Sequence, residues 1–104
     1  MANLILWNPD RFVIKEYQDT GAVYIYDKVD NVVYYNQTAT SILTELAQQN
    51  LSRYSKKATK DLEALLTNPF TILTIENPNG GKPFVCFDHN TFSSLLLYAV
   101  TKAL

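Results

Sequence analysis

The sequence has few of the residues from which catalytic and metal sites are usually built. Among its 104 residues there is one cysteine, Cys86, and one histidine, His89. A single cysteine cannot close an intramolecular disulfide, so nothing indicates an oxidising compartment and we expect a cytoplasmic protein. A zinc or cysteine–histidine site needs further ligands at a recognised spacing, which the sequence does not offer. We therefore expect no cofactor, metal or catalytic residue, with Cys86 buried and Asp88-His89-Asn90 capping a helix.

Long hydrophobic runs and an excess of one charge are also absent. No segment approaches the roughly 20 apolar residues of a membrane span, and the first residues lack the basic start of a signal peptide. Nine basic and ten acidic side chains leave a formal charge of −1, so no basic excess is available to neutralise a row of phosphates. We therefore expect neither a membrane nor a nucleic acid as the partner.

Glycine and proline are scarce too, with 3 and 4 residues, and no flexible linker divides the chain. The length suits one small domain, which buries roughly two-thirds of its unfolded surface and has little room for a deep substrate cavity. We interpret residues 1–104 as a single domain in which a binding role is favoured over an enzymatic one.

The pattern that is present changes its period along the chain. Between residues 12 and 35, short β-branched and aromatic runs alternate with polar turns, which predicts a three-stranded antiparallel meander. Its expected strands are Phe12–Tyr17, Val23–Tyr26 and Val32–Tyr35. The Asn-Gly-Gly reversal signal at 79–81 predicts a second hairpin from residues 70–75 and 84–87.

From Asn36 onward the apolar spacing becomes helical, which makes the fold class α+β. Asn36 is a good N-cap for a first helix whose apolar stripe is expected to pack on the sheet. A second helix is expected to begin at Ser55 and to end near Thr67, because Pro69 disfavours helix in the residue before it. The expected stripes are Ala39, Ile42, Leu43 and Leu46 in the first helix, and Ala58, Leu62, Leu65 and Leu66 in the second.

The last predicted helix is more apolar than one buried face requires. Asp88 or Asn90 is expected to cap it, and it runs through Leu104. Leu97, Tyr98 and Leu104 are then candidates for a contact with a second subunit or another protein, since exposed apolar surface commonly marks an interface. Isolated exposed side chains are the alternative. The expected packing stripe is Phe92, Leu95, Leu96, Ala99, Val100 and Ala103.

Tyrosine is unusually frequent, and five of the 7 tyrosines lie in the predicted meander. Strand alternation places Tyr24 and Tyr26 on one face of the sheet, and turns Tyr34 and Tyr35 to opposite faces. Cross-strand aromatic pairing explains such rings structurally. A peptide-binding surface is the functional alternative, because it uses rigid amphipathic rings.

A basic cluster surrounds the start of the second predicted helix. It comprises Arg53, Lys56, Lys57 and Lys60. Cations are favoured at helix C-termini rather than N-termini, so an acidic partner is one explanation of this placement. A solvated helix face is the other.

The stretch 21–46 resembles the PqqD-like RiPP recognition elements, which are small winged-helix-like domains. The resemblance rests on a three-stranded meander followed by a helix that opens with Asn36 and small residues before Ile42 and Leu43. It covers roughly residues 12–66, of which 55–66 are similar to the last helix of the family. The middle helix of the family is expected to be shortened or absent at 48–54. The hairpin and helix from 70–104 have no counterpart in the minimal family domain.

This resemblance implies a non-catalytic partner of a radical-SAM maturation enzyme. In the family, the leader of a ribosomal precursor peptide adds as a strand to the open edge of the meander and lies against the last helix. On this sequence, Lys57 and Lys60 would then meet leader carboxylates. The implied edge is Val32, Val33, Tyr34 and Tyr35, and the implied wall of the groove is Lys57, Ala58, Asp61, Leu62 and Leu65.

Two other classes of function stay open at this point. A winged-helix DNA-binding regulator would use the basic start of the second predicted helix, although the balanced charge argues against it. A small inhibitor or viral accessory protein is suggested by the length and by the lack of catalytic residues. The apolar last helix also leaves open a homodimer.

Overall fold

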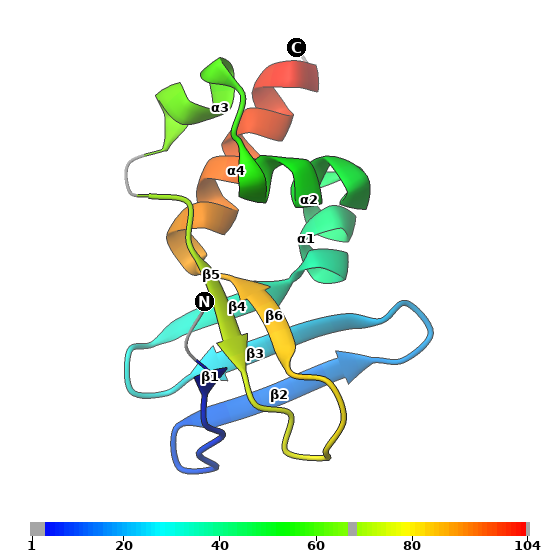
Figure 1. Cartoon of the computed structure of the whole chain (residues 1–104), viewed down its shortest axis with the longest axis vertical. Coiled ribbons are helices and arrows are strands. Elements are labelled where there is room, and N and C mark those ends of the chain that lie inside the picture. Colours follow the sequence, from blue (N-terminus) through cyan, green and yellow to red (C-terminus); the bar gives the residue numbers. More distant parts are fainter. Residues whose placement is uncertain (1–3, 67–68, 104) are drawn as a thin grey trace.

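The computed structural model describes residues 4–66 and 69–103, and the fold of this part is α+β, with one six-stranded sheet and four helices. The elements in chain order are β1 (Leu4–Ile5), β2 (Phe12–Tyr17), β3 (Ala22–Asp27), β4 (Val32–Asn36), α1 (Gln37–Thr44), α2 (Gln48–Lys56), α3 (Lys60–Leu65), β5 (Ile72–Ile75), β6 (Phe84–Phe87) and α4 (His89–Ala103). None of these helices is long and apolar enough to cross a bilayer. Figure 1 shows the strands at one end of the molecule and the helices at the other.

The N-terminal strands form the predicted antiparallel meander. Strand β3 pairs with β2 on one side and with β4 on the other, with Ile25 opposite Ile14 and Tyr34. Gly21 and Asn31, in the two connecting turns, adopt positive φ angles of 79° and 55°, which glycine and asparagine tolerate best. The prediction of a meander within an α+β fold is confirmed.

The predicted C-terminal hairpin also forms, but it joins the same sheet. Strands β5 and β6 pair antiparallel, and β6 in turn pairs with β4 through Tyr35 opposite Phe87 and Asn36 opposite Cys86. The short β1, which the sequence pattern did not predict, runs parallel to β5. The strand order is therefore β1-β5-β6-β4-β3-β2.

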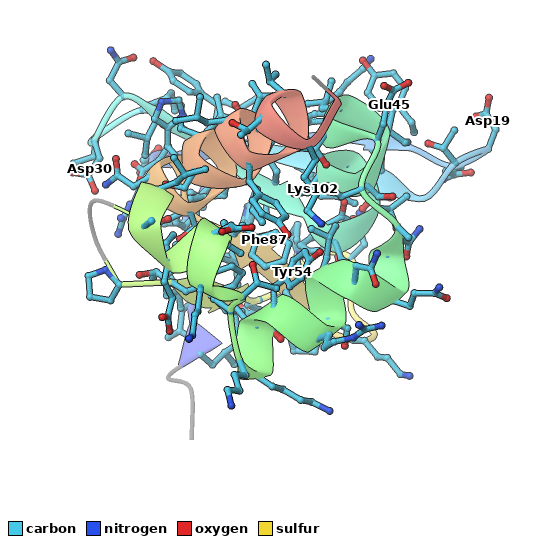
Figure 2. All side chains as sticks on the ribbon, turned by 90° about the horizontal axis from the view of Figure 1, so that it is seen from above. Asp19, Asp30, Glu45, Tyr54, Phe87 and Lys102 are labelled. Carbon is cyan, nitrogen blue, oxygen red and sulfur yellow. The ribbon has the colours of Figure 1, made fainter. Side chains whose placement is uncertain are left out.

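Two apolar clusters lie on the two sides of this sheet. The β5–β6 hairpin crosses over the meander (Figure 1), and the first cluster fills the space between them. The second cluster joins the helices to β6, and Figure 2 shows two of its members, Tyr54 and Phe87, between the helices. The first cluster is Phe12, Val23, Ile25, Tyr34, Ile75 and Cys86, and the second is Leu51, Tyr54, Leu62, Phe87, Leu95 and Tyr98.

Asn36 joins the meander to the first helix, as the sequence predicted. Its side-chain oxygen accepts hydrogen bonds from the N–H groups of Ala39 at 2.8 Å and Val23 at 3.0 Å. Its amide nitrogen donates to the carbonyl of Gly21 at 3.0 Å. One side chain therefore caps α1 and fixes the start of β3.

The buried face of α1 differs from the predicted apolar stripe. Ala39, Thr40 and Thr44 are buried, whereas Ile42 and Leu43 are 49% and 46% exposed. The two threonine hydroxyls donate to carbonyls four residues earlier, at 2.9 and 2.7 Å, so they are satisfied without water. The predicted stripe is confirmed at Ala39 and wrong at Ile42 and Leu43, because it assigned only apolar residues to the buried side.

The segment predicted as the second helix contains the end of α2 and the whole of α3, with a break between them. Ser55 lies inside α2, and α3 is capped by Thr59, whose hydroxyl accepts from the N–H of Leu62 at 3.2 Å. The start predicted at Ser55 is therefore wrong, and the helix that was expected to be shortened or absent at 48–54 is present as the 9 residues of α2. The predicted end near Thr67 lies outside the described residues, and α3 itself ends at Leu65.

Helix α4 is capped by Asp88, whose carboxylate accepts a hydrogen bond from the N–H of Thr91 at 2.8 Å. Of the two predicted caps, Asp88 and Asn90, the structure therefore confirms Asp88. Its predicted stripe is only partly correct, because Leu96 and Val100 are 38% and 52% exposed. The buried residues are Thr91, Phe92, Ser94, Leu95 and Tyr98. The Thr91 hydroxyl accepts from a backbone N–H of the loop before β5, so a polar residue fits on the buried face.

A wholly buried carboxylate, that of Asp27, links the meander strands. Arg11 donates to it through Nε at 3.1 Å and through a terminal nitrogen at 2.8 Å, and the hydroxyl of Tyr34 donates at 3.0 Å. The N–H groups of Val29 and Asp30 donate to its other oxygen at 3.0 and 3.2 Å. These donors, with the Arg11 hydrogen bond as the largest cause, lower the pKa of Asp27 to about 2.

We expect this carboxylate to make stability depend on pH in the acid range. A carboxylate with a lowered pKa stabilises the fold fully above its unfolded pKa of 3.8, and the stabilisation is lost as the pH falls towards 2. The shift corresponds to about 2 kcal/mol. Urea unfolding at a series of pH values should give a steep acid loss of stability in the wild type and a flatter profile in Asp27→Asn. Equal slopes for the two proteins would contradict this assignment.

Candidate functional site

Strand β2 is a six-residue edge of the sheet. The N–H of Lys28 donates to the carbonyl of Arg11 at 2.8 Å, which makes these two residues a hydrogen-bonded pair in line with the β2–β3 register. Because such pairs alternate in an antiparallel ladder, the backbone groups of Phe12, Ile14 and Glu16 point away from β3. The N–H of Phe12 is bound by a carbonyl of the preceding loop at 2.8 Å. The N–H groups of Ile14 and Glu16 remain on the open side.

The side chains of β2 on the outer face of the sheet are accessible as well. Val13 and Tyr17 are 50% and 47% exposed, and Lys15 lies exposed between them. The ammonium of Lys15 is 5.4 Å from the centroid of the Tyr17 ring. A central lysine protects an edge strand against aggregation, while the backbone edge stays available to a specific partner.

A row of four aromatic rings runs across the outer face of the sheet from this edge. Tyr17 meets Tyr24 with centroids 5.8 Å apart, and Tyr24 meets Tyr35 at the same distance, both edge to face. Tyr35 stacks on Phe92 of α4 at 3.9 Å. The predicted alternation is confirmed, because Tyr34 faces the opposite side and binds Asp27. The row ties the helical layer to the meander and ends at the exposed ring of Tyr17.

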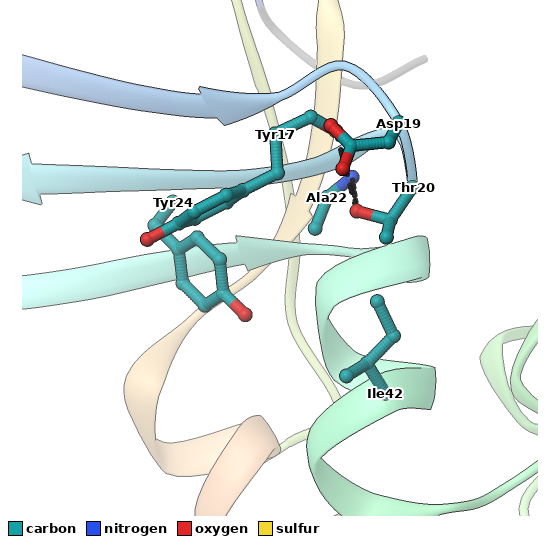
Figure 3. Close-up of a pocket in the computed structure, with 6 residues that line it drawn as sticks. All are labelled: Tyr17, Asp19, Thr20, Ala22, Tyr24 and Ile42. Carbon is teal, nitrogen blue, oxygen red and sulfur yellow. Dashed lines mark hydrogen bonds between the residues drawn. The ribbon is translucent and has the colours of Figure 1, made fainter.

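A cleft of about 230 Å³ opens beside the exposed end of this row (Figure 3). It is lined by Tyr17, Asp19, Thr20, Ala22, Tyr24 and Ile42. The hydroxyl of Thr20 accepts from the N–H of Ala22 and donates to the carbonyl of Tyr17, both at 3.2 Å, which holds the hairpin end in place. The sequence pattern did not predict this cleft. The signal for it was a tyrosine at the end of a strand followed by a short polar turn.

The edge that the resemblance implied at β4 is only partly open. Strand β4 lies between β3 and β6, and its Tyr35 is paired with β6. Val32 and Val33 are partly buried, and Tyr34 is buried. Beyond the end of β6, the start of α4 faces this part of β4 across a hollow of about 220 Å³. The prediction of a fully open edge was wrong at Tyr35, because strand pairing with a distant hairpin leaves no local signal.

The implied wall of the groove is also divided. Leu62 is fully buried and Ala58 partly buried, while Lys57 and Lys60 are exposed. Two further members of the implied wall line a cleft of about 410 Å³ between α3 and α4, which is bordered by Asp61, Ala64, Leu65, Tyr98, Thr101 and Lys102. In Figure 1, α3 lies at the helical end of the molecule, so edge and wall do not form one groove.

The basic cluster has a structural explanation in part. Arg53 and Lys56 lie in the last turn of α2, where the helix dipole favours cations. The prediction placed Arg53 and Lys56 at the start of the second helix. It was wrong because they belong to α2, which ends at Lys56, and the next helix, α3, begins at Lys60. Their position alone therefore no longer requires an acidic partner.

Of the three contact residues predicted on the last helix, the structure describes two, and one of these is exposed. Leu97 is 50% exposed, Tyr98 is 2% exposed, and Leu104 lies outside the described residues. Tyr98 meets the ring of Tyr54 edge to face at 5.7 Å, and its hydroxyl accepts from Thr59 at 3.3 Å. The Thr59 hydrogen bond, and then the nearby Lys102, lower the pKa of Tyr98. The prediction of an exposed Tyr98 was wrong.

The cysteine and histidine do not converge. Cys86 lies in the first apolar cluster, where burial raises the pKa of its thiol to about 12. Asp88 caps α4, and His89 is exposed at the start of that helix. Within the part of the chain that the structure describes, no three metal-ligating side chains come together. The prediction of a buried Cys86 beside a capping segment is confirmed.

The two neighbours on α4 should respond differently to the same change. Tyr98→Ser removes a buried ring and should cost roughly 3 to 5 kcal/mol of unfolding free energy, as buried aromatic truncations do. Leu97→Ser should change it by about 0.5 kcal/mol or less, since that side chain is half exposed. Tyr98→Phe keeps the ring and removes only the hydroxyl, so its change in unfolding free energy measures the contribution of the hydroxyl. Urea unfolding of the three variants measures these effects, and equal losses for Leu97→Ser and Tyr98→Ser would contradict the burial described.

Comparison of the chain with protein-family models, curated proteins and solved structures gave no match. The open edge of β2 and the cleft beside it are therefore the strongest structural guides to function.

Proposed function

We propose that this chain is a non-catalytic peptide-binding module that takes up an extended segment of its partner as an added strand along β2. The supporting observation is the combination of an edge strand, on which the N–H groups of Ile14 and Glu16 point outward, with two half-exposed side chains, Val13 and Tyr17, on one face. Strand addition uses both features, because backbone hydrogen bonds give affinity and alternate side chains give specificity.

The resemblance of residues 12–66 to recognition elements supports the nature of the segment. It favours the leader of a ribosomal precursor peptide, which the module would present to a radical-SAM maturation enzyme. In that family the leader adds to the third strand of the meander. Here β6 occupies part of that edge, so we place the added strand on β2, at the other side of the meander.

The helical end of the molecule would then face the enzyme. Leu97 is half exposed on α4, and Leu96 and Val100 beside it are 38% and 52% exposed. Residues 91–101 carry no charged side chain. An uncharged apolar helix face of this kind suits a protein contact.

Peptide selection tests the proposal directly. The immobilised chain is panned against a random 12-residue display library, and enriched peptides are synthesised and titrated by calorimetry. We expect Glu16→Pro to weaken binding about tenfold or more, because proline removes a donor that faces the open edge. Glu16→Gln removes only the charge and should leave affinity within about twofold.

A second measurement locates the bound peptide if Glu16→Pro fails to fold. Amide exchange by NMR should slow at Ile14 and Glu16 when a selected peptide is added, and should not change at Val33. A folded Glu16→Pro protein with wild-type affinity would refute binding at β2. A library that yields no binding peptide would refute the module itself.

A further inference from the structure

We infer that the cleft between Tyr17, Tyr24 and Ile42 is a pocket for one basic side chain, lysine or arginine, of the bound strand. The identity of the partner rests on the proposed function, whereas the pocket is a property of the chain itself.

Two walls of the cleft are aromatic. The planes of Tyr17 and Tyr24 stand at 88° with their centroids 5.8 Å apart, so the rings form adjacent sides of a corner (Figure 3). Ile42, which is 49% exposed, adds an apolar side from α1. A cation within about 6 Å of a ring face is attracted by the ring quadrupole, and the aliphatic stem of lysine or arginine packs on apolar surface.

One of these rings already interacts with a cation. Lys15 holds its ammonium 5.4 Å from the centroid of Tyr17, on the same face of the strand. Lys15 does not line the cleft, so the side of Tyr17 that faces the cleft is still available. The Tyr17 ring therefore attracts a cation, and the ammonium of Lys15 is a like charge that a basic occupant of the cleft would also meet.

The rim of the cleft supplies the charge that favours a basic occupant. Asp19 lies at the hairpin end, and Figure 3 shows its carboxylate turned back towards Tyr17. Among the residues that the structure describes, the ion pairs are those of Arg11 with Asp27 and Asp30, and Asp19 is in none. A basic side chain in the cleft would be attracted by this carboxylate, whereas a neutral apolar side chain would gain no such attraction and an acidic one would be repelled.

The position of the cleft fits a strand added to β2. Tyr17 is the last residue of β2, so a segment paired along Phe12–Tyr17 ends beside the cleft. The volume of about 230 Å³ is several times the roughly 30 Å³ that one water molecule occupies, which leaves room for a charged head group and part of its stem. The terminal part of the bound segment would thus carry the basic residue.

Small model compounds test the pocket without any peptide. The chain is titrated with N-acetyl-arginine amide and N-acetyl-lysine amide, with N-acetyl-norleucine amide as the uncharged control. Aromatic NMR signals of Tyr17 and Tyr24 should shift saturably with both cations, and the norleucine compound should bind about fivefold more weakly or worse, which corresponds to about 1 kcal/mol.

A matched pair of variants then tests the carboxylate. Asp19→Asn should weaken binding of the arginine compound about threefold or more, whereas Asp10→Asn, an exposed aspartate outside the cleft, should not. Equal shifts with norleucine, or equal binding by the Asp19→Asn and Asp10→Asn variants, would overturn the inference.

The selected peptides separate this inference from the proposed function. Replacing their basic residue by norleucine should lower affinity for the wild type but not for Asp19→Asn. Peptides that bind along β2 without any need for a basic residue would leave the module intact and refute the pocket. Binding of the arginine compound by a chain that selects no peptide would refute the module and leave the pocket intact.

Discussion

The buried carboxylate of Asp27 is the constraint on which the rest of the sheet depends. An ionised carboxylate is costly to bury unless it is paired and hydrogen-bonded. Its donors are Arg11, just before β2, Tyr34 in β4, and two N–H groups of the β3–β4 turn. The bonds therefore hold all three meander strands in a single register. A slip by one residue would turn Asp27 to the outer face and remove it from these donors, because strand side chains alternate between faces.

That register determines what the outer face presents. With Tyr24 opposite Tyr35, and Tyr17 diagonal to Tyr24, the aromatic row reaches from the buried Phe92 to the free edge. The hairpin β5–β6 then adds to the meander on the β4 side, which leaves β2 as the long open edge. The same arrangement that completes the core thus places the candidate site at the opposite side of the meander.

Local signals in the sequence were sufficient for the meander, the C-terminal hairpin, α1 and α4, but they missed β1 and α2 and were insufficient for the arrangement of the strands. The turn residues around Gly21 and the cap at Asn36 are short-range features, and the meander and α1 followed from them. The pairing of β6 with β4 joins residues about fifty positions apart and has no such signal. The helix faces were misassigned because Thr40 and Thr44 satisfy their own hydroxyls in the helix and so occupy buried positions. For the site, tyrosine orientation was predictable, but the choice of open edge depended on the distant hairpin.

The placement of reactive groups bears on what the proposed module would do to a bound segment. Cys86 is buried with its thiol pKa raised to about 12, and Tyr98, whose pKa is lowered, lies among the helices. The β2 edge is bordered by Val13, Lys15 and Tyr17, and neither Cys86 nor Tyr98 is part of it. Under the proposed function, a segment paired along β2 is held and oriented by the backbone edge and by these side chains, and the maturation enzyme acts on it. The strands and the helices lie at opposite ends of the molecule (Figure 1), so the proposed edge on β2 is separate from the exposed apolar residues of α4, and the segment and the enzyme would bind different parts of the chain.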